Sequence, residues 1–206
     1  NLYVLMASAT DQALRSANKS IEDIDGIFSA CNPTGDLLLP NVSSVVASLL
    51  NCGAFYSGGN ATGCSGGLVA LGMARHRLVS DSLNDKIKNY LVIAGDETSV
   101  MIRQGTSDEM LFSDGASALV VTNDKDKIAY YSVNSADNIT YHQKADALKL
   151  KRGNLFLEHD GRAIYAFAAR SMKSILSMLG TKEFPDGRYF IPHQANREII
   201  METARL

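Results

Sequence analysis

One short stretch of the sequence limits the possible folds more than any other. Residues 90–95, Tyr-Leu-Val-Ile-Ala-Gly, are apolar throughout and show no alternation with polar residues. Such a run is typical of a β-strand that is covered on both faces, as in a sheet packed between helices. Asp96 and Glu97 follow the run and fit a turn or an interface better than a catalytic acid pair. We therefore expect a buried sheet with helices on each side.

Other segments of the chain fit the same plan. Apolar residues recur at helical spacing or form short runs between turns, so helices and strands are predicted in alternation. We expect helices at residues 2–17, 42–50, 64–80, 162–179 and 194–206, and strands at residues 26–31, 54–60, 90–95, 116–122, 128–133 and 189–191. Residues 134–160 are polar and irregular. This alternation predicts the α/β fold class.

Length and charge exclude several other classes of protein. The chain has 206 residues, with 20 Lys plus Arg against 22 Asp plus Glu, so it carries no basic surplus for binding nucleic acid. No run of about 18 apolar residues is present, so no membrane span is expected. Three cysteines without metal-like spacing, and no visible secretory signal, indicate a reducing, cytoplasmic compartment. We predict no metal site and no bound cofactor.

The sequence around Cys64 is the first with a chemical implication. Residues 60–67, Asn-Ala-Thr-Gly-Cys-Ser-Gly-Gly, predict a strand, a sharp turn and the start of a helix. A cysteine in the first turn of a helix meets free backbone N–H groups and the positive end of the helix dipole, and both stabilise a thiolate. The flanking glycines allow a substrate to approach the sulfur closely. The plain alternative is a small buried cysteine in a glycine-rich turn, which is the more common case for a lone cysteine.

A second stretch places a histidine at the edge of the predicted sheet. Residues 190–196, Phe-Ile-Pro-His-Gln-Ala-Asn, put His193 after a predicted strand and before a predicted helix. The carboxyl ends of strands are where α/β proteins build their sites. Alone, such a residue is more often a helix-capping or core histidine. The combination with Cys64 favours a functional pair.

These motifs resemble those of the β-ketoacyl-acyl-carrier-protein synthases III, which have the thiolase fold. Gly-Cys-Ser-Gly-Gly around Cys64 is similar to the family's nucleophile motif, and Pro-His-Gln-Ala-Asn around His193 to its catalytic histidine motif. Residues 114–118, Asp-Gly-Ala-Ser-Ala, resemble the family's glycine-rich turn, which makes Gly115 a candidate substrate-binding residue. Residues 159–172 resemble the helix after the family's Met-Asp-Gly turn. The motifs occur in the family's order and extend over nearly all of the chain.

The resemblance implies a five-layered αβαβα fold built from two similar halves. It assigns residues 1–123 to most of the N-terminal half, with the nucleophile, and residues 124–206 to part of the C-terminal half, with the histidine. The start of the first half and the end of the second would be missing. That expectation agrees with a chain that begins without Met and stops within a predicted helix. The resemblance also implies a homodimer.

A reaction follows from the same resemblance. Cys64 would accept an acyl group from acyl-CoA. A malonyl group on acyl carrier protein would then lose carbon dioxide and condense with the Cys64 thioester, giving a 3-oxoacyl thioester of fatty acid or polyketide biosynthesis. His193 would assist the decarboxylation together with an Asn expected beyond Leu206. Asn196 resembles a residue near the pantetheine tunnel, and an ordinary first-turn helix residue is an equally good interpretation of it.

Several positions depart from the family's pattern. Gly67 stands where a bulky residue is common, Ser113 where glycine is usual, and Glu198 where a basic residue is usual, while the Asp-Arg pair that helps to hold CoA is not evident. These differences favour a specialised relative over the housekeeping initiator. Leu39 stands where bacterial initiators can carry Phe at the end of the acyl pocket. A deeper pocket is one interpretation of Leu39, and simple packing within the leucine run at 37–39 is the other.

Three other functions stay open at this point. The same scaffold could transfer the acyl group to an amine or alcohol, with His193 as the general base. A non-catalytic partner subunit would complete the pocket of an active copy, although such subunits usually lack the cysteine or the histidine. A Cys–His hydrolase has the same order of residues, but the sequence around Cys64 lacks the papain signature. Decarboxylation of a malonyl thioester separates the first alternative from the condensing reaction.

Overall fold

The computed structural model describes residues 1–32, 41–53, 56–60, 62–126, 133, 148–149, 156–178 and 191–205. It divides into two compact units. The first unit comprises Asn1–Met101 with Phe112–Ile139, and the second comprises Ile102–Leu111 with Thr140–Leu206. The expected division at residues 123 and 124 concerns the two halves of the family fold, and it stays a prediction.

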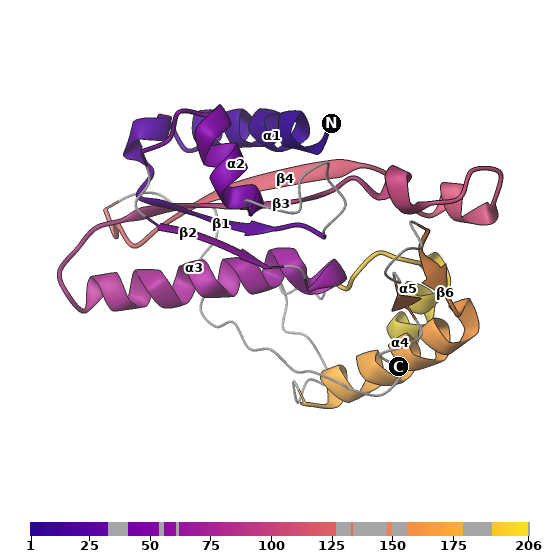
Figure 1. Cartoon of the computed structure of the whole chain (residues 1–206). Coiled ribbons are helices and arrows are strands. Elements are labelled where there is room, and N and C mark those ends of the chain that lie inside the picture. Colours follow the sequence, from indigo (N-terminus) through magenta and orange to yellow (C-terminus); the bar gives the residue numbers. More distant parts are fainter. Residues whose placement is uncertain are drawn as a thin grey trace. The chain divides into compact units, whose positions relative to one another are not determined.

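The first unit is built on a four-stranded sheet in the order β2-β1-β3-β4 (Figure 1). Its strands are β1 (Gly26–Ala30), β2 (Tyr56–Asn60), β3 (Asn89–Asp96) and β4 (Gly115–Thr122). Strand β1 pairs in parallel with β2 and with β3, whereas β4 pairs antiparallel with β3. The carboxyl ends of β1, β2 and β3 therefore lie at one edge of the sheet.

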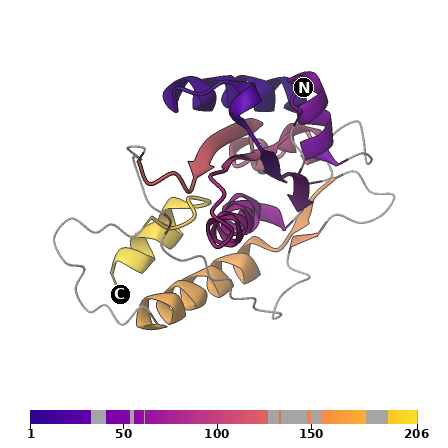
Figure 2. The same ribbon diagram turned by 90° about the vertical axis from the view of Figure 1, so that its left-hand side faces the viewer.

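Helices cover both faces of this sheet. Helices α1 (Leu2–Ser16) and α2 (Val42–Leu49) lie on one face, and α3 (Gly66–Ser82) lies on the other, as Figures 1 and 2 show. Asn1 caps α1 and Asn41 caps α2, each by accepting a backbone N–H of the first turn on its side-chain oxygen. The α/β class predicted from the run at residues 90–95 is confirmed for this unit, with the helices on either side of the sheet.

The two central strands divide their side chains between two cores. Ile27, Leu91 and Ile93 pack with α1 and α2, while Phe28, Ala30, Tyr90 and Val92 pack with α3. All seven side chains are at most 5% exposed. Neighbouring strand residues point to opposite faces, so a run without polar residues is what two-sided burial requires. Burial of each large side chain contributes roughly 1.5–3 kcal/mol to folding.

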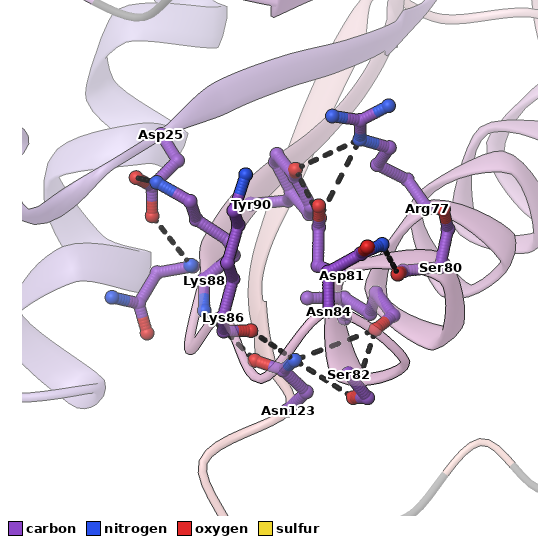
Figure 3. A network of polar contacts seen from close by, with 12 residues as sticks. Asp25, Arg77, Ser80, Asp81, Ser82, Asn84, Lys86, Lys88, Tyr90 and Asn123 are labelled. Carbon is purple, nitrogen blue, oxygen red and sulfur yellow. Dashed lines mark hydrogen bonds and ion pairs between the residues drawn. The ribbon is translucent and has the colours of Figure 1, made fainter.

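A polar network joins the last turns of α3 to the start of β3 (Figure 3). It lies at the end of the sheet opposite to the carboxyl ends of the parallel strands. The Asp81 carboxylate on α3 accepts a 2.6 Å hydrogen bond from the Tyr90 hydroxyl and lies 3.5 Å from the Arg77 guanidinium. Burial and the bond to Asp81 raise the pKa of Tyr90. The Asn123 amide donates to the Lys86 carbonyl and accepts from the Lys88 N–H, so it ties the segment after β4 to the α3–β3 connection.

Four one-turn 3₁₀ helices complete the described connections: η1 (Ile21–Asp23), η2 (Gly63–Ser65), η3 (Thr98–Met101) and η4 (Ser107–Met110). Before η1, Ser20 and Asp23 form a capping box. The Ser20 backbone N–H and hydroxyl both donate to the Asp23 carboxylate and lower its pKa.

In its described residues, the second unit has η4, two α-helices and a short pair of strands. Strands β5 (Leu148–Lys149) and β6 (Glu158–His159) pair antiparallel, and α4 (Gly161–Met178) packs against α5 (Arg197–Ala204). Within this unit the His159 imidazole lies 3.5 Å from the Asp108 carboxylate, and the Arg103 guanidinium lies 5.2 Å from the centre of the Phe156 ring. No helix in the described parts of the chain is both long enough and apolar enough to cross a lipid bilayer.

The structure changes the boundaries of several predicted elements. Helix α3 begins at Gly66 instead of residue 64, and α5 begins at Arg197 instead of residue 194, because Asn196 caps it. Ile191, expected to end a strand, lies in irregular backbone and is 79% exposed, while the rest of that strand lies outside the described residues. The strand expected at residues 128–133 also lies outside them, apart from Val133, which is not in a strand.

The first prediction concerns the polar network. Tyr90→Phe removes the donor that satisfies the Asp81 carboxylate, and both residues are almost fully buried, at 2% and 4% exposed. We expect this variant to lose about 1–3 kcal/mol of unfolding free energy, measured by urea denaturation. Tyr165→Phe on α4 is the matched control, because Tyr165 is 39% exposed, and it should change stability by less than about 0.5 kcal/mol. Equal stability of the two variants would contradict the structural role of the hydroxyl.

Candidate functional site

Cys64 lies in a turn that follows the edge strand β2. Gly63 has a φ of +62°, a conformation that favours glycine, and η2 then leads directly into α3. The sequence predicted Cys64 in the first turn of the helix. The structure places it instead in the 3₁₀ turn η2, just before α3. The alternative of a small buried cysteine is wrong, since Cys64 is exposed. The Ser65 hydroxyl donates to the Thr62 carbonyl at 3.0 Å, which ties this turn together.

A cavity of about 340 Å³ lies beside this turn. It is bounded by the carboxyl ends of β1 and β3, the start of α3 and one face of β4. The residues that line it are Ala30, Cys31, Asn32, Gly63, Cys64, Gly67, Leu68, Leu71, Val92, Ala94, Gly95, Asp96, Ser117 and Leu119. Ligands of α/β proteins commonly bind outside the carboxyl ends of the strands, and this cavity has that position. An accessible thiol therefore borders a space large enough for a small acyl group.

Glycine at position 67 shapes the wall of the cavity. A Cβ atom at Gly67 would lie 3.2 Å from the Cβ of Ala94 on β3, which is closer than ordinary van der Waals contact. The absence of a side chain thus allows the first turn of α3 to lie directly against the sheet. The family that the sequence resembles often carries a bulky residue at this position. In this chain, Gly67 instead allows a close contact between α3 and β3.

Asp96 is the acidic residue of the cavity wall. Its carboxylate accepts a 2.7 Å hydrogen bond from the Asn32 backbone N–H and a 3.1 Å hydrogen bond from the Asn32 side-chain amide. Burial raises the pKa of Asp96, and the two bonds from Asn32 act in the opposite direction. The Cys31 thiol, also on this wall, donates to the Asn32 carbonyl at 2.8 Å. Asn32 and Asp96 thus join the ends of two neighbouring strands.

Gly115 begins β4 and stands directly opposite Asp96 in the register with β3. It is exposed, and a Cβ atom added there would meet nothing within 4 Å. The preceding residue, Asp114, accepts a 2.8 Å hydrogen bond from the Ser99 N–H and a 2.7 Å bond from the Ser99 hydroxyl. The predicted glycine-rich turn is thus anchored to η3 through Asp114, and a substrate-binding role for Gly115 stays a prediction.

The other predicted site residues lie elsewhere. His193 belongs to the second unit, where it is exposed in irregular backbone just before α5. Asn196 is the N-cap of α5, and its side-chain oxygen accepts a 2.7 Å hydrogen bond from the Glu198 N–H. This bond gives Asn196 a structural role, and its role in substrate binding stays a prediction. Leu39 lies outside the described residues. The roles of Cys64, in the first unit, and His193, in the second, also stay predictions.

The structure adds two residues that the sequence did not assign to the site. Asn32 and Asp96 both line the cavity, whereas the sequence favoured a turn or an interface for Asp96. A signal for Asp96 was present, because it has the same parity along β3 as Val92 and Ala94 and so belongs to the same face. Among the residues that the structure describes, no group of three or more His, Cys, Asp or Glu side chains is arranged to hold a metal ion.

Comparison with known proteins gives a consistent set of relatives. Residues 60–137 match the family described as 3-oxoacyl-[acyl-carrier-protein] synthase III. The β-ketoacyl-[acyl-carrier-protein] synthase III of Aquifex aeolicus is 30% identical over 210 residues, which cover 97% of this chain and 63% of that protein. The synthase III of Streptococcus uberis is also 30% identical, over 100% of this chain and 65% of the relative.

Solved structures agree with these sequence matches. The crystal structure of the Aquifex aeolicus 3-oxoacyl-[acyl-carrier-protein] synthase III superposes with a TM-score of 0.75 at 29% identity, over 100% of this chain and 65% of that one. A fungal type III polyketide synthase superposes with a TM-score of 0.80 at 22% identity, over 98% of this chain and 60% of that one, and shows likeness of fold alone. The chain thus spans just under two thirds of the length of these proteins and corresponds to part of a thiolase-like α/β fold. Over nearly its whole length, the chain is thus similar to the β-ketoacyl-acyl-carrier-protein synthases III, which are condensing enzymes of the thiolase fold.

Proposed function

We propose that the protein is an acyltransferase that loads an acyl group from acyl-CoA onto Cys64 and then condenses it with a malonyl thioester. The observation that carries this proposal is the exposed Cys64 thiol on the wall of a cavity at the carboxyl ends of the strands, in a chain of the condensing-enzyme family. The product would be a 3-oxoacyl thioester, as in fatty acid or polyketide-type biosynthesis.

The first step forms a covalent thioester. The Cys64 thiolate attacks the carbonyl carbon of acyl-CoA, and the thiolate of CoA leaves when the tetrahedral intermediate collapses. The glycines around Cys64 leave its backbone accessible, so the Cys64 N–H is the natural donor to the developing oxyanion. CoA as the acyl carrier agrees with the crystal structure of CsyB, a protein of the same fold that was solved with CoA. Loading and condensation through one covalent intermediate predict ping-pong kinetics.

The second step develops negative charge on the thioester oxygen of the malonyl group. Carbon dioxide leaves, the resulting enolate attacks the carbonyl carbon of the Cys64 thioester, and Cys64 is released as a thiolate. A neutral His193 imidazole that donates an N–H to the thioester oxygen would stabilise this enolate. The second donor to this oxygen would be the Asn expected beyond Leu206. The extender carried on acyl carrier protein, the homodimer and the cytoplasmic location belong to this proposal, and the free state of all three cysteines is compatible with a reducing compartment.

Loading of the thiol is tested by intact-protein mass spectrometry of the full-length protein after mixing with a panel of acyl-CoAs. We expect a mass increase equal to one acyl group in the wild type and in Cys52→Ser, and none in Cys64→Ser. Cys64 is the exposed thiol on the cavity wall, whereas the Cys31 thiol on the same wall is partly buried and donates to the Asn32 carbonyl. Cys52→Ser is the matched control, since Cys52 is a free cysteine that does not line the cavity. Acylation of Cys64→Ser, or failure of every acyl-CoA to load the wild type, would overturn the proposal.

The role of His193 is tested by separating the two steps. His193→Ala should load Cys64 at nearly the wild-type rate, because the proposed role of the imidazole is in decarboxylation. Release of carbon dioxide from malonyl-acyl carrier protein, followed with a carbon-14 label, should fall by about 10²–10³-fold, as expected when one oxyanion donor is lost. Normal decarboxylation by this variant would contradict the assignment. A wild type that releases no carbon dioxide but acylates an amine or alcohol would favour the alternative acyltransferase.

The turn that presents Cys64 gives a further prediction. Gly63→Ala places a side chain at a φ of +62°, and Gly105→Ala does the same at a φ of +78° in the second unit. Neither Cβ atom would lie within 4 Å of another atom of the described residues, so backbone strain is the main cost of each substitution. Both variants should therefore lose a similar unfolding free energy of roughly 1–2 kcal/mol. Only Gly63→Ala should also slow acylation of Cys64. Equal loading rates of the two variants would show that the conformation of Gly63 does not position the thiol.

A further inference from the structure

A carboxylate on the wall of the Cys64 cavity has no role in the proposed reaction. Asp96 is half-buried at the end of β3, and its two oxygens accept hydrogen bonds from the backbone and the side chain of Asn32. Two bonds from one neighbouring residue restrict the carboxylate to one orientation. Asp96 is thus a fixed acceptor rather than a mobile surface acid.

The register of the sheet shows on which face Asp96 lies. Along β3, Asp96 has the same parity as Val92 and Ala94, and Val92 packs in the core beneath α3 with Ala94 against it. Asp96 continues this row past the covered part of the sheet and into the cavity wall. Gly115 is its partner on β4, and no atom of the described residues lies within 4 Å of a Cβ built at that glycine. The sheet therefore leaves open room beside the carboxylate.

The rest of the wall makes this acceptor distinctive. Leu68, Leu71, Val92 and Leu119 supply apolar surface, and no Lys or Arg is among the described residues that line the cavity. A carboxylate has about four acceptor directions, and Asn32 uses two of them. An apolar acyl chain placed against Asp96 would remove water from the carboxylate without replacing its hydrogen bonds, which is unfavourable. A hydroxyl group at the same place would replace them.

We propose that Asp96 determines which acyl group Cys64 accepts, by favouring a short acyl chain that carries a hydrogen-bond donor and by disfavouring one that carries a negative charge. The inference rests on the proposed function, since it requires Cys64 to be acylated within this cavity. A hydrogen bond to a charged acceptor contributes enough free energy to make acylation with the hydroxylated chain about tenfold or more faster than acylation with the plain chain. A second carboxylate in the cavity would be repelled by Asp96 at close range.

The test compares four-carbon acyl-CoAs in the full-length protein. Initial rates of acylation are measured by intact-protein mass spectrometry with butyryl-CoA, both enantiomers of 3-hydroxybutyryl-CoA, 4-hydroxybutyryl-CoA and succinyl-CoA. In the wild type, at least one hydroxylated chain should load about tenfold faster than butyryl, and succinyl should load slowest. The four chains are similar in size, so their differences report the chemistry of the wall.

The variant Asp96→Asn removes the charge with little change in shape. We expect it to load succinyl faster than the wild type does and to lose most of the preference for the hydroxylated chain. Asp124→Asn, in the turn after β4 and away from the cavity, should keep the wild-type order. If Asp96→Asn does not fold, the wild-type rates still test the proposal, because equal loading of butyryl and every hydroxylated chain overturns it.

Each result has a distinct meaning. Butyryl loading as fast as every hydroxylated chain in the wild type overturns the role of Asp96 and leaves the proposed function intact. An unchanged order of rates in folded Asp96→Asn also overturns it, because the preference would then have another source. Failure of all five acyl-CoAs, together with the wider panel, overturns the proposed function and this inference with it.

Discussion

Burial of β1 and β3 on both faces is the constraint on which the first unit depends. Their side chains alternate between a core packed against α1 and α2 and a core packed against α3. The large side chains in each core are almost fully buried. Two-sided burial requires helices on both sides and an unbroken apolar run, and it makes parallel pairing favourable. Parallel pairing in turn brings the carboxyl ends of the strands to one edge, where the helical cover stops.

Polar side chains follow the buried residues at the same edge of the sheet. Ala30 and Ala94 pack in the core next to α3. Asn32 lies two positions after Ala30, past the end of β1, and Asp96 lies two positions after Ala94, at the end of β3. A side chain at that place is close enough to the core to be fixed and partly desolvated, yet it faces a cavity. The hydrogen bonds between Asn32 and Asp96 join the two strand ends beyond Ala30 and Ala94, the last residues in the register of β1 with β3. The position of the site is thus a direct result of where burial ends.

The sequence predicted the elements well because periodicity is a local property. The apolar run at residues 90–95, the helical spacing at residues 2–17 and the turn at Cys64 each depend on neighbouring residues, and the structure confirms each element within a few residues. Motif spacing correctly indicated the family. It did not assign Asn32 and Asp96 to the cavity, because their meeting depends on the pairing of β1 with β3 across 64 positions of sequence. The start of α3 was placed too early because a 3₁₀ turn and an α-helical turn have similar local signals.

The shape of the cavity and its chemistry are specified by different residues. Two glycines let the elements around the cavity pack closely. A Cβ at Gly67 would lie 3.2 Å from the Cβ of Ala94, and one at Gly95, on the opposite face of β3, would lie 2.9 Å from the Gly115 carbonyl oxygen and 3.0 Å from the Met6 side chain. Substitution at these glycines would disturb the packing of helix on sheet. Asp96, Ser117 and Leu119 instead face the space, so changes there alter what the cavity accepts without moving the strands. Substitutions at the wall residues can therefore change the chemistry of the cavity while the buried strands keep Cys64 in place.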